Sequence, residues 1–195
     1  KYYDYYEIGY FAMCFIICTV VYAIITPFLK IYTAGVTDIN YFIDWLPLAF
    51  VIMKFLNWCR TPAAYTINFA GKFIETRKKA IMEAVINIAV SLLLVKPLGI
   101  FGVVAGSAAA YLYSAVYSVW YVNTKLADLN YKKTVFRWIM FIAAFFVFSF
   151  ALSCINVQIS GYFSLVLFAA AVGVAAVIYY AAVCLVFNRS TCISA

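Results

Sequence analysis

The sequence predicts an all-α integral membrane protein built as a bundle of six transmembrane helices. Two observations carry this prediction. First, 68% of the 195 residues are apolar and only 11% are charged, which gives a mean hydropathy of +1.02. Second, the apolar residues form several runs longer than about 18 residues, which is enough to cross a bilayer. The alternative is a soluble protein with one large buried helical core, but such a core would have to hide more apolar surface than soluble proteins do.

The helices are read from the apolar runs in chain order. Each run has about 20 residues or more, and at 1.5 Å per residue it spans a hydrocarbon core of about 30 Å. The predicted helices cover about residues 8–32, 42–70, 77–97, 100–123, 136–155 and 162–187. Together they are expected to form a single six-helix transmembrane lobe over residues 1–195.

The first two helices enclose a polar loop. Tyrosines precede and open helix 8–32, which is typical of an aromatic belt at the membrane interface. They are Tyr2, Tyr3, Tyr5, Tyr6 and Tyr10. The loop after this helix contains Thr37, Asp38 and Asn40, and helix 42–70 ends before Gly71.

The next two helices, 77–97 and 100–123, are expected to form a tight hairpin because Pro97 and Gly99 are turn-forming residues. Helix 100–123 carries a small residue at every fourth position, a pattern that lets another helix backbone approach closely. This small-residue stripe consists of Gly102, Gly106, Ala110, Ser114 and Ser118.

The last two helices are separated by a short polar loop from Asn156 to Gly161. Helix 136–155 follows the second basic segment of the chain, and helix 162–187 is almost wholly apolar. A patch of Ala169, Gly173 and Ala176 on helix 162–187 again indicates close helix packing.

Two basic segments predict the orientation. Residues 72–79 and 125–137 contain eight of the fourteen Lys and Arg residues, and positive charge favours cytoplasmic loops. Helix alternation then places both termini of this segment in the cytoplasm. The predicted location is the cell (cytoplasmic) membrane, which the chain crosses several times. The net charge of +7 is explained by these loops, so no nucleic-acid partner is expected.

Helix 42–70 differs from the others because polar residues form one stripe along it. The stripe covers an arc of roughly 140° on a helical wheel. Its members are Lys54, Asn57, Arg60, Thr61, Tyr65 and Asn68. A central Lys or Arg costs about 2.5–3.5 kcal/mol in a membrane helix, which favours a water-filled cavity or a partner beside the stripe. Alternatively, Arg60 marks the end of a shorter helix and extends to the interface, although this leaves Lys54 unexplained.

Helix 77–97 adds one acidic residue to this region. Glu83, Asn87 and Ser91 lie on one helix face at successive intervals of four residues. Glu83 is expected about 10 Å and Arg60 about 15 Å from the shared cytoplasmic loop. Either these two residues pair and leave Lys54 as the free cation, or Glu83 is a protonatable coupling site. Glu83 and Asn87 are therefore candidates for a coupling site or a structural ion pair.

Enzymatic and metal chemistry have little support. The chain has no His, and its six cysteines are scattered through apolar runs without the spacing of a metal site. No carboxylate pair and no long loop is present to hold an active site. No cofactor or metal is expected, and a membrane transporter is favoured over a glycan polymerase or ligase. A purely structural subunit would leave Lys54 and Arg60 unexplained.

A pattern in residues 71–107 resembles a known family. Gly71 is followed by a basic loop, a helix with a central Asn87, the turn Gly99-Ile-Phe-Gly102 and a small-residue helix. This order resembles the polysaccharide biosynthesis flippases of the multidrug/oligosaccharidyl-lipid/polysaccharide exporter superfamily, over essentially the whole chain. The resemblance implies two bundles of helices around a central cavity, of which this chain is similar to the C-terminal one. The missing N-terminal lobe of the same protein would then be a partner.

The resemblance also implies a substrate. In the lipid bilayer, such a flippase moves an oligosaccharide linked to polyprenyl diphosphate by alternating access, for surface polysaccharide biosynthesis. Arg60 and Lys54 would neutralise the diphosphate, and Asn57 and Asn68 would bind sugar or phosphate oxygens. The alternative within the superfamily is a cation-coupled multidrug exporter, which would favour buried acids over buried bases.

Overall fold

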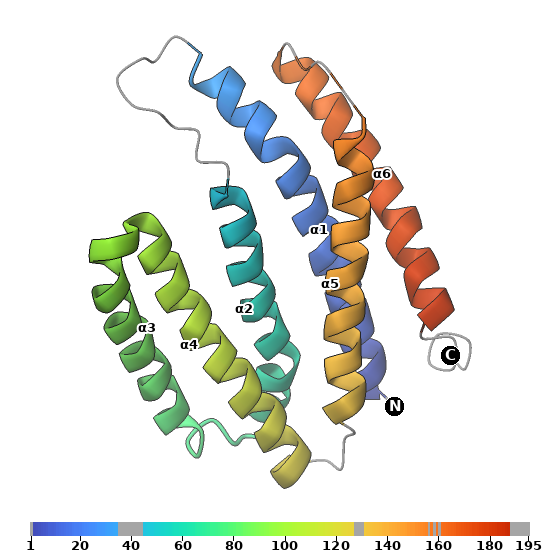
Figure 1. Ribbon diagram of the computed structural model, residues 1–195. Helices are drawn as coiled ribbons and strands as arrows, with labels where there is room; N and C mark the ends of the chain where they lie inside the picture. The colour runs from blue at the N-terminus through green and yellow to red at the C-terminus, as the bar shows by residue number, and fades with distance from the viewer. Residues whose placement is uncertain are drawn as a thin grey trace. The chain divides into compact units, whose positions relative to one another are not determined.

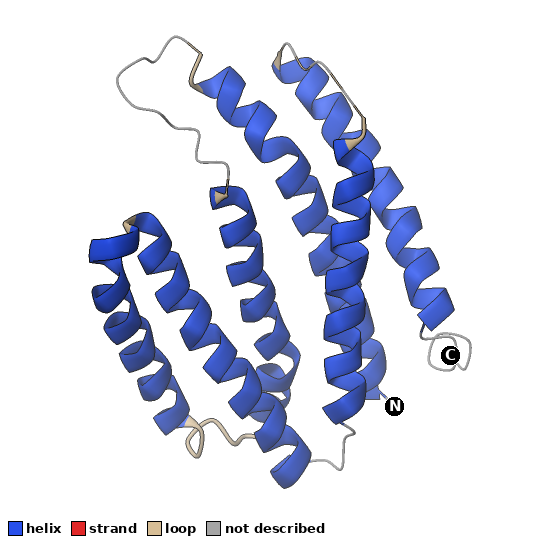
Figure 2. Cartoon of the chain, in the orientation of Figure 1, coloured by secondary structure: helices blue, strands red, loops and turns tan. Residues whose placement is uncertain are grey.

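The computed structural model describes residues 2–34, 45–126, 131–155, 157, 159 and 161–187. Over these residues the chain is all-helical, which confirms the predicted structural class (Figures 1 and 2). The predicted loop residues Thr37, Asp38 and Asn40, together with Asn156, lie outside the described residues.

The described residues contain six α-helices, and their bounds agree with the predicted ranges to within a few residues. They are α1 (Tyr2–Tyr32), α2 (Leu46–Phe69), α3 (Arg77–Leu98), α4 (Ile100–Tyr121), α5 (Tyr131–Ser153) and α6 (Tyr162–Phe187). A short π-helical segment, η1 (Val122–Leu126), extends α4. The largest differences lie at the starts of α1 and α5, which begin before the predicted residues 8 and 136.

Five of these helices are long and apolar enough to cross a membrane, so the chain is a multi-pass membrane protein. They are α1, α3, α4 with η1, α5 and α6. The prediction of six transmembrane helices is thus confirmed for five. Helix α2 has 24 residues, which is long enough, but with its polar stripe it has no stretch apolar enough to place it among the five. That α2 also crosses the membrane stays a prediction, as does the orientation of the chain.

The chain divides into two compact units. Unit 1 comprises Lys1–Pro47 and Arg137–Ala195, and unit 2 comprises Leu48–Phe136. Unit 1 therefore holds α1, α6 and most of α5, whereas unit 2 holds most of α2 together with α3 and α4. The prediction that residues 1–195 form one lobe of a two-lobe protein stays a prediction.

Aromatic side chains form the core of unit 1. Helices α1 and α6 lie side by side, and rings of α5 pack against both. The ring centres of Phe15 and Phe141 are 5.3 Å apart, and those of Phe141 and Tyr180 are 6.1 Å apart. The hydroxyls of Thr19 and Tyr180 lie 3.0 Å apart and form a buried hydrogen bond between α1 and α6. Because aromatic rings bury a large area each, this cluster supplies much of the packing between the three helices.

A close hairpin of α3 and α4 forms the core of unit 2 (Figure 1). Gly99 makes the turn with a positive φ of 56°, which favours glycine, and its N–H donates to the carbonyl of Val95 at 2.8 Å. All five residues of the small-residue stripe are buried. A Cβ atom on Gly106 would lie 2.9 Å from the carbonyl oxygen of Asn87 on α3. The predicted hairpin and the predicted close approach along the stripe are therefore confirmed.

Candidate functional site

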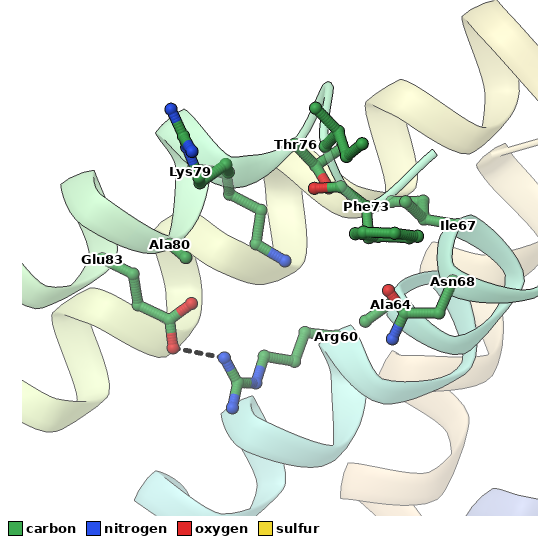
Figure 3. Close-up of a pocket in the computed structure, with 11 residues that line it drawn as sticks. Arg60, Ala64, Ile67, Asn68, Phe73, Thr76, Lys79, Ala80 and Glu83 are labelled. Atoms are coloured by element: carbon green, nitrogen blue, oxygen red, sulfur yellow. Dashed lines mark hydrogen bonds and ion pairs between the residues drawn. The ribbon is translucent and has the colours of Figure 1, made fainter. Parts of the chain in front are cut away.

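A cavity of about 500 Å³ opens within unit 2, between α2, the loop 70–76 and the first turns of α3 (Figure 3). It is lined by Arg60, Ala64, Ile67, Asn68, Phe73, Ile74, Thr76, Arg77, Lys79, Ala80 and Glu83. Three of these residues are basic and one is acidic, so the lining carries a net positive charge at neutral pH. This cationic cavity is the candidate functional site.

Arg60 is fixed at the cavity by partners on three helices. Its guanidinium forms an ion pair with Glu83 of α3, which Figure 3 shows as a dashed line. Its Nε donates to Oδ1 of Asn57 at 2.9 Å, and a second nitrogen donates to Oγ of Ser114 at 3.4 Å. The guanidinium also lies 4.8 Å from the ring centre of Tyr111 on α4, within the range of a cation–π contact.

These contacts distinguish between the interpretations of the polar stripe. The structure pairs Arg60 with Glu83, as one of the two interpretations of Glu83 expected. Helix α2 continues beyond Arg60 to Phe69, so the helix itself does not end at Arg60. The alternative that Arg60 lies at the end of the membrane-crossing part and extends to the interface stays a prediction. The side chains of Arg60 and Glu83 are 27% and 18% exposed, which leaves the pair within reach of water in the cavity.

The other predicted site residues are only partly brought together. Asn68 lines the cavity, and Asn57 contributes by holding Arg60. Lys54 is exposed and is not among the lining residues. Asn87 accepts a hydrogen bond from Ser91 at 3.2 Å, within the α3–α4 contact. The roles proposed for these residues in binding or coupling stay predictions.

Arg77 and Lys79 are basic lining residues that the sequence analysis missed, because both fall in the basic segment assigned to a cytoplasmic loop. Of the two, Lys79 is the buried one. The residue is only 9% exposed, and its ammonium donates to Oγ of Ser118 at 2.7 Å. Two signals were available in the sequence. Lys79 lies four residues before Glu83 on the same helix face, and Ser118 supplies a hydroxyl within the small-residue stripe.

The loop 70–76 forms one wall of the cavity and is held by Glu75. This carboxylate accepts hydrogen bonds from Nζ of Lys72 and from the hydroxyl of Tyr121 on α4, both at 2.6 Å. Gly71 has a φ of 70° and turns the chain out of α2. The hydrogen bonds from Lys72 and Tyr121 lower the pKa of the Glu75 carboxyl below its ordinary value of 4.5.

The pH dependence of this loop follows from the lowered pKa of Glu75. Because the folded pKa lies below the unfolded one, the two hydrogen bonds stabilise the loop above pH 4.5 and lose that effect as the pH falls through the folded pKa. We expect hydrogen exchange in residues 70–76, corrected for intrinsic rates, to increase in acid. In Glu75→Gln the exchange should be faster at neutral pH and should lose this acid-induced increase. If the wild type and Glu75→Gln showed equal protection of residues 70–76 from hydrogen exchange at every pH, Glu75 would not stabilise this loop.

A second cluster of charged residues lies in unit 1, where the sequence analysis found none. Arg137 of α5 pairs with Asp4 at 2.6 Å and also forms an ion pair with Glu7, both on α1. Arg137 and Glu7 are 3% and 1% exposed, so the pair is fully buried. Tyr3 approaches Glu7 from the same helix, with its hydroxyl 3.5 Å from Oε1. The two ion pairs therefore compensate a carboxylate that is buried between α1 and α5 in unit 1.

Comparison with protein-family models, curated proteins and solved structures finds no match to the chain. Across the residues that the structure describes, no group of three or more His, Cys, Asp or Glu side chains could hold a metal ion. Unit 2 therefore holds a cation-lined cavity within a multi-pass membrane protein.

Proposed function

We propose that this chain is one lobe of a flippase for oligosaccharide linked to polyprenyl diphosphate, working by alternating access in the cell membrane. The observation that carries the proposal is the charge of the cavity, which is lined by Arg60, Arg77 and Lys79 against one acid, Glu83. The resemblance of residues 71–107 to the polysaccharide biosynthesis flippases supports the same conclusion. On this proposal the protein is a transporter and not an enzyme.

The physical requirement on such a protein is a path for a charged headgroup. A diphosphate cannot enter hydrocarbon without a large desolvation penalty, whereas a lipid tail can remain in the bilayer. A wet cavity with surplus positive charge replaces the water around the phosphates. Asn68 lines the same cavity and supplies an amide that can bind sugar or phosphate oxygens.

The proposal is tested by transport in cells that express the full-length protein. We expect Arg60→Ala to reduce export of the lipid-linked oligosaccharide at least about tenfold, which corresponds to about 1.4 kcal/mol. The reason is that this change removes a cation of the cavity and also leaves Glu83 unpaired. Surface glycan and accumulated lipid-linked precursor are the two quantities to measure, together with the amount of inserted protein.

Two further variants test whether the loss of export in Arg60→Ala comes from the cavity. Lys96→Ala is the matched control, because Lys96 is an exposed residue in the last turn of α3 and does not line the cavity. Lys54→Ala tests the remaining predicted cation, which should matter less than Arg60 because it lies outside the cavity lining. Export at the wild-type rate by well-inserted Arg60→Ala protein would mean that the cavity does not carry the substrate.

The competing proposal, a cation-coupled drug exporter, predicts a different result. An exporter of cationic drugs needs unpaired acids in its cavity, but the acid that lines this cavity is bonded to Arg60. If the full-length protein confers resistance to cationic drugs that Glu83→Gln abolishes, the drug exporter is the correct assignment.

A further inference from the structure

We propose that Lys79, anchored by Ser118, is the side chain that binds the phosphate groups of the substrate. This inference rests on the proposed function and names the binding residue within its cavity. Arg60 is the more obvious candidate from the sequence, but its charge is already compensated by Glu83. Among the described contacts, the ammonium of Lys79 bonds only the neutral hydroxyl of Ser118.

The charges that line the cavity leave two cations beyond the Arg60–Glu83 pair, the exposed Arg77 and the buried Lys79. Arg60 and Glu83 are opposite charges in direct contact and contribute no net charge together. Lys79 is 9% exposed, and a buried ammonium that has only a neutral partner is destabilised by desolvation. Glu83 lies one turn from Lys79 on α3 but is bonded to Arg60 (Figure 3). An anion in the cavity would relieve this cost, which is the physical basis for binding.

The donor capacity of Lys79 suits a phosphate. A lysine ammonium has three N–H donors, and Ser118 takes one of them. Two donors remain for phosphate oxygens, and lysine binds phosphate as a compact point charge. Figure 3 shows Lys79 extending from α3 toward Arg60, on the side where the cavity lies.

The small-residue stripe of α4 sets the spacing of the two cations. Ser118 holds Lys79, and Ser114 contacts Arg60 one helical turn away. The two serines are about 6 Å apart along the helix axis, at 1.5 Å per residue. At this separation, one phosphate group of a diphosphate can contact Lys79 while the second phosphate group approaches Arg60. A diphosphate fits this pair of anchors better than a single phosphate does.

The experiment measures binding of inorganic pyrophosphate to the purified full-length protein by titration calorimetry in detergent at low salt. We expect Lys79→Gln to weaken binding at least tenfold and Lys79→Arg to keep it within a few-fold. Ser118→Ala retains the charge and removes only the anchor, so it should weaken binding about threefold. Lys96→Gln, which removes an exposed charge outside the cavity, should bind as wild type does.

The outcomes separate this inference from the proposed function. If pyrophosphate binds Lys79→Gln as tightly as wild type while Arg60→Ala still fails in transport, Lys79 is not the phosphate ligand but the flippase proposal stands. If wild-type protein binds no pyrophosphate, the inference about Lys79 is wrong. The proposed flippase function is then tested only by the transport measurement in cells. If Lys79→Gln does not fold, the other two variants test whether Lys79 binds pyrophosphate. Unchanged binding in Ser118→Ala together with loss of binding in Lys79→Arg would contradict a charge contact between Lys79 and the phosphate.

Discussion

Replacing Arg137 with methionine is expected to lower the free energy of unfolding by about 3–5 kcal/mol, the cost of removing one partner from a buried ion pair. Arg137 is 3% exposed and is bonded to both Asp4 and Glu7. Without it, Glu7, which is 1% exposed, becomes a buried carboxylate without its cation. The free energy of unfolding is measured by denaturant titration in micelles, followed by circular dichroism.

A triple variant separates the unpaired charge from the loss of packing. Asp4→Asn, Glu7→Gln and Arg137→Met together leave no net charge in the cluster, and removing a whole buried ionic group is often close to neutral. We therefore expect this protein to recover most of the stability lost in Arg137→Met. Lys133→Met, on the exposed surface of the same helix, is the control and should change stability by less than about 0.5 kcal/mol. Equal stabilities for Arg137→Met and Lys133→Met would show that the buried pair does not stabilise the bundle.

Features encoded by neighbouring residues could be predicted from the sequence. The five confirmed spans follow from the length and apolarity of continuous runs, which need no knowledge of the fold. The α3–α4 hairpin follows from Gly99, whose positive φ is a local requirement. The burial of Gly102 and Gly106 follows from their spacing of four, since that spacing places both on one helix face.

The charged residues could not be placed in the same way. Arg137 and Glu7 are 130 positions apart in the chain, so nothing local shows that they meet. Arg137 ends the basic segment 125–137, which predicts a cytoplasmic loop, and the predicted helix begins at residue 136, whereas α5 begins at Tyr131. A basic residue near a helix end has the same local pattern whether it faces solvent or a buried acid.

The cations of the candidate site could likewise be predicted only in part from the sequence. The expected depths of Arg60 and Glu83 allowed them to pair as one of two alternatives, and the structure shows that pair. Helical periodicity grouped Lys54 with Arg60, yet Lys54 is exposed and outside the cavity lining. Lys79 is buried only because α4 comes close enough to α3 for Ser118 to reach it, and that distance is a tertiary property. The close approach of the two helices is thus a precondition for the site.

Replacing Gly106 with leucine is expected to separate α3 from α4 and to lower the free energy of unfolding by about 3 kcal/mol, as overpacking of a close contact does. A Cβ atom at this position would lie 2.8 Å from the backbone nitrogen of Ser91 and 2.9 Å from the carbonyl oxygen of Asn87. These are backbone atoms, so the clash cannot be relieved by a side-chain rotation. The helices themselves have to move apart.

The matched control is Gly9→Leu on α1, where an added Cβ meets nothing within 4 Å. This variant makes the same chemical change in open space and should not lower the free energy of unfolding, because replacing a glycine inside a helix favours the helix by about 0.5–1 kcal/mol. Because Ser118 holds Lys79 across the same helix contact, Gly106→Leu should also weaken pyrophosphate binding, while Gly9→Leu should not. Calorimetry on both variants, at temperatures where both remain folded, measures that difference. If Gly106→Leu were as stable as Gly9→Leu, the backbones of α3 and α4 would not be in contact, and the position of Lys79 in the cavity would need another cause.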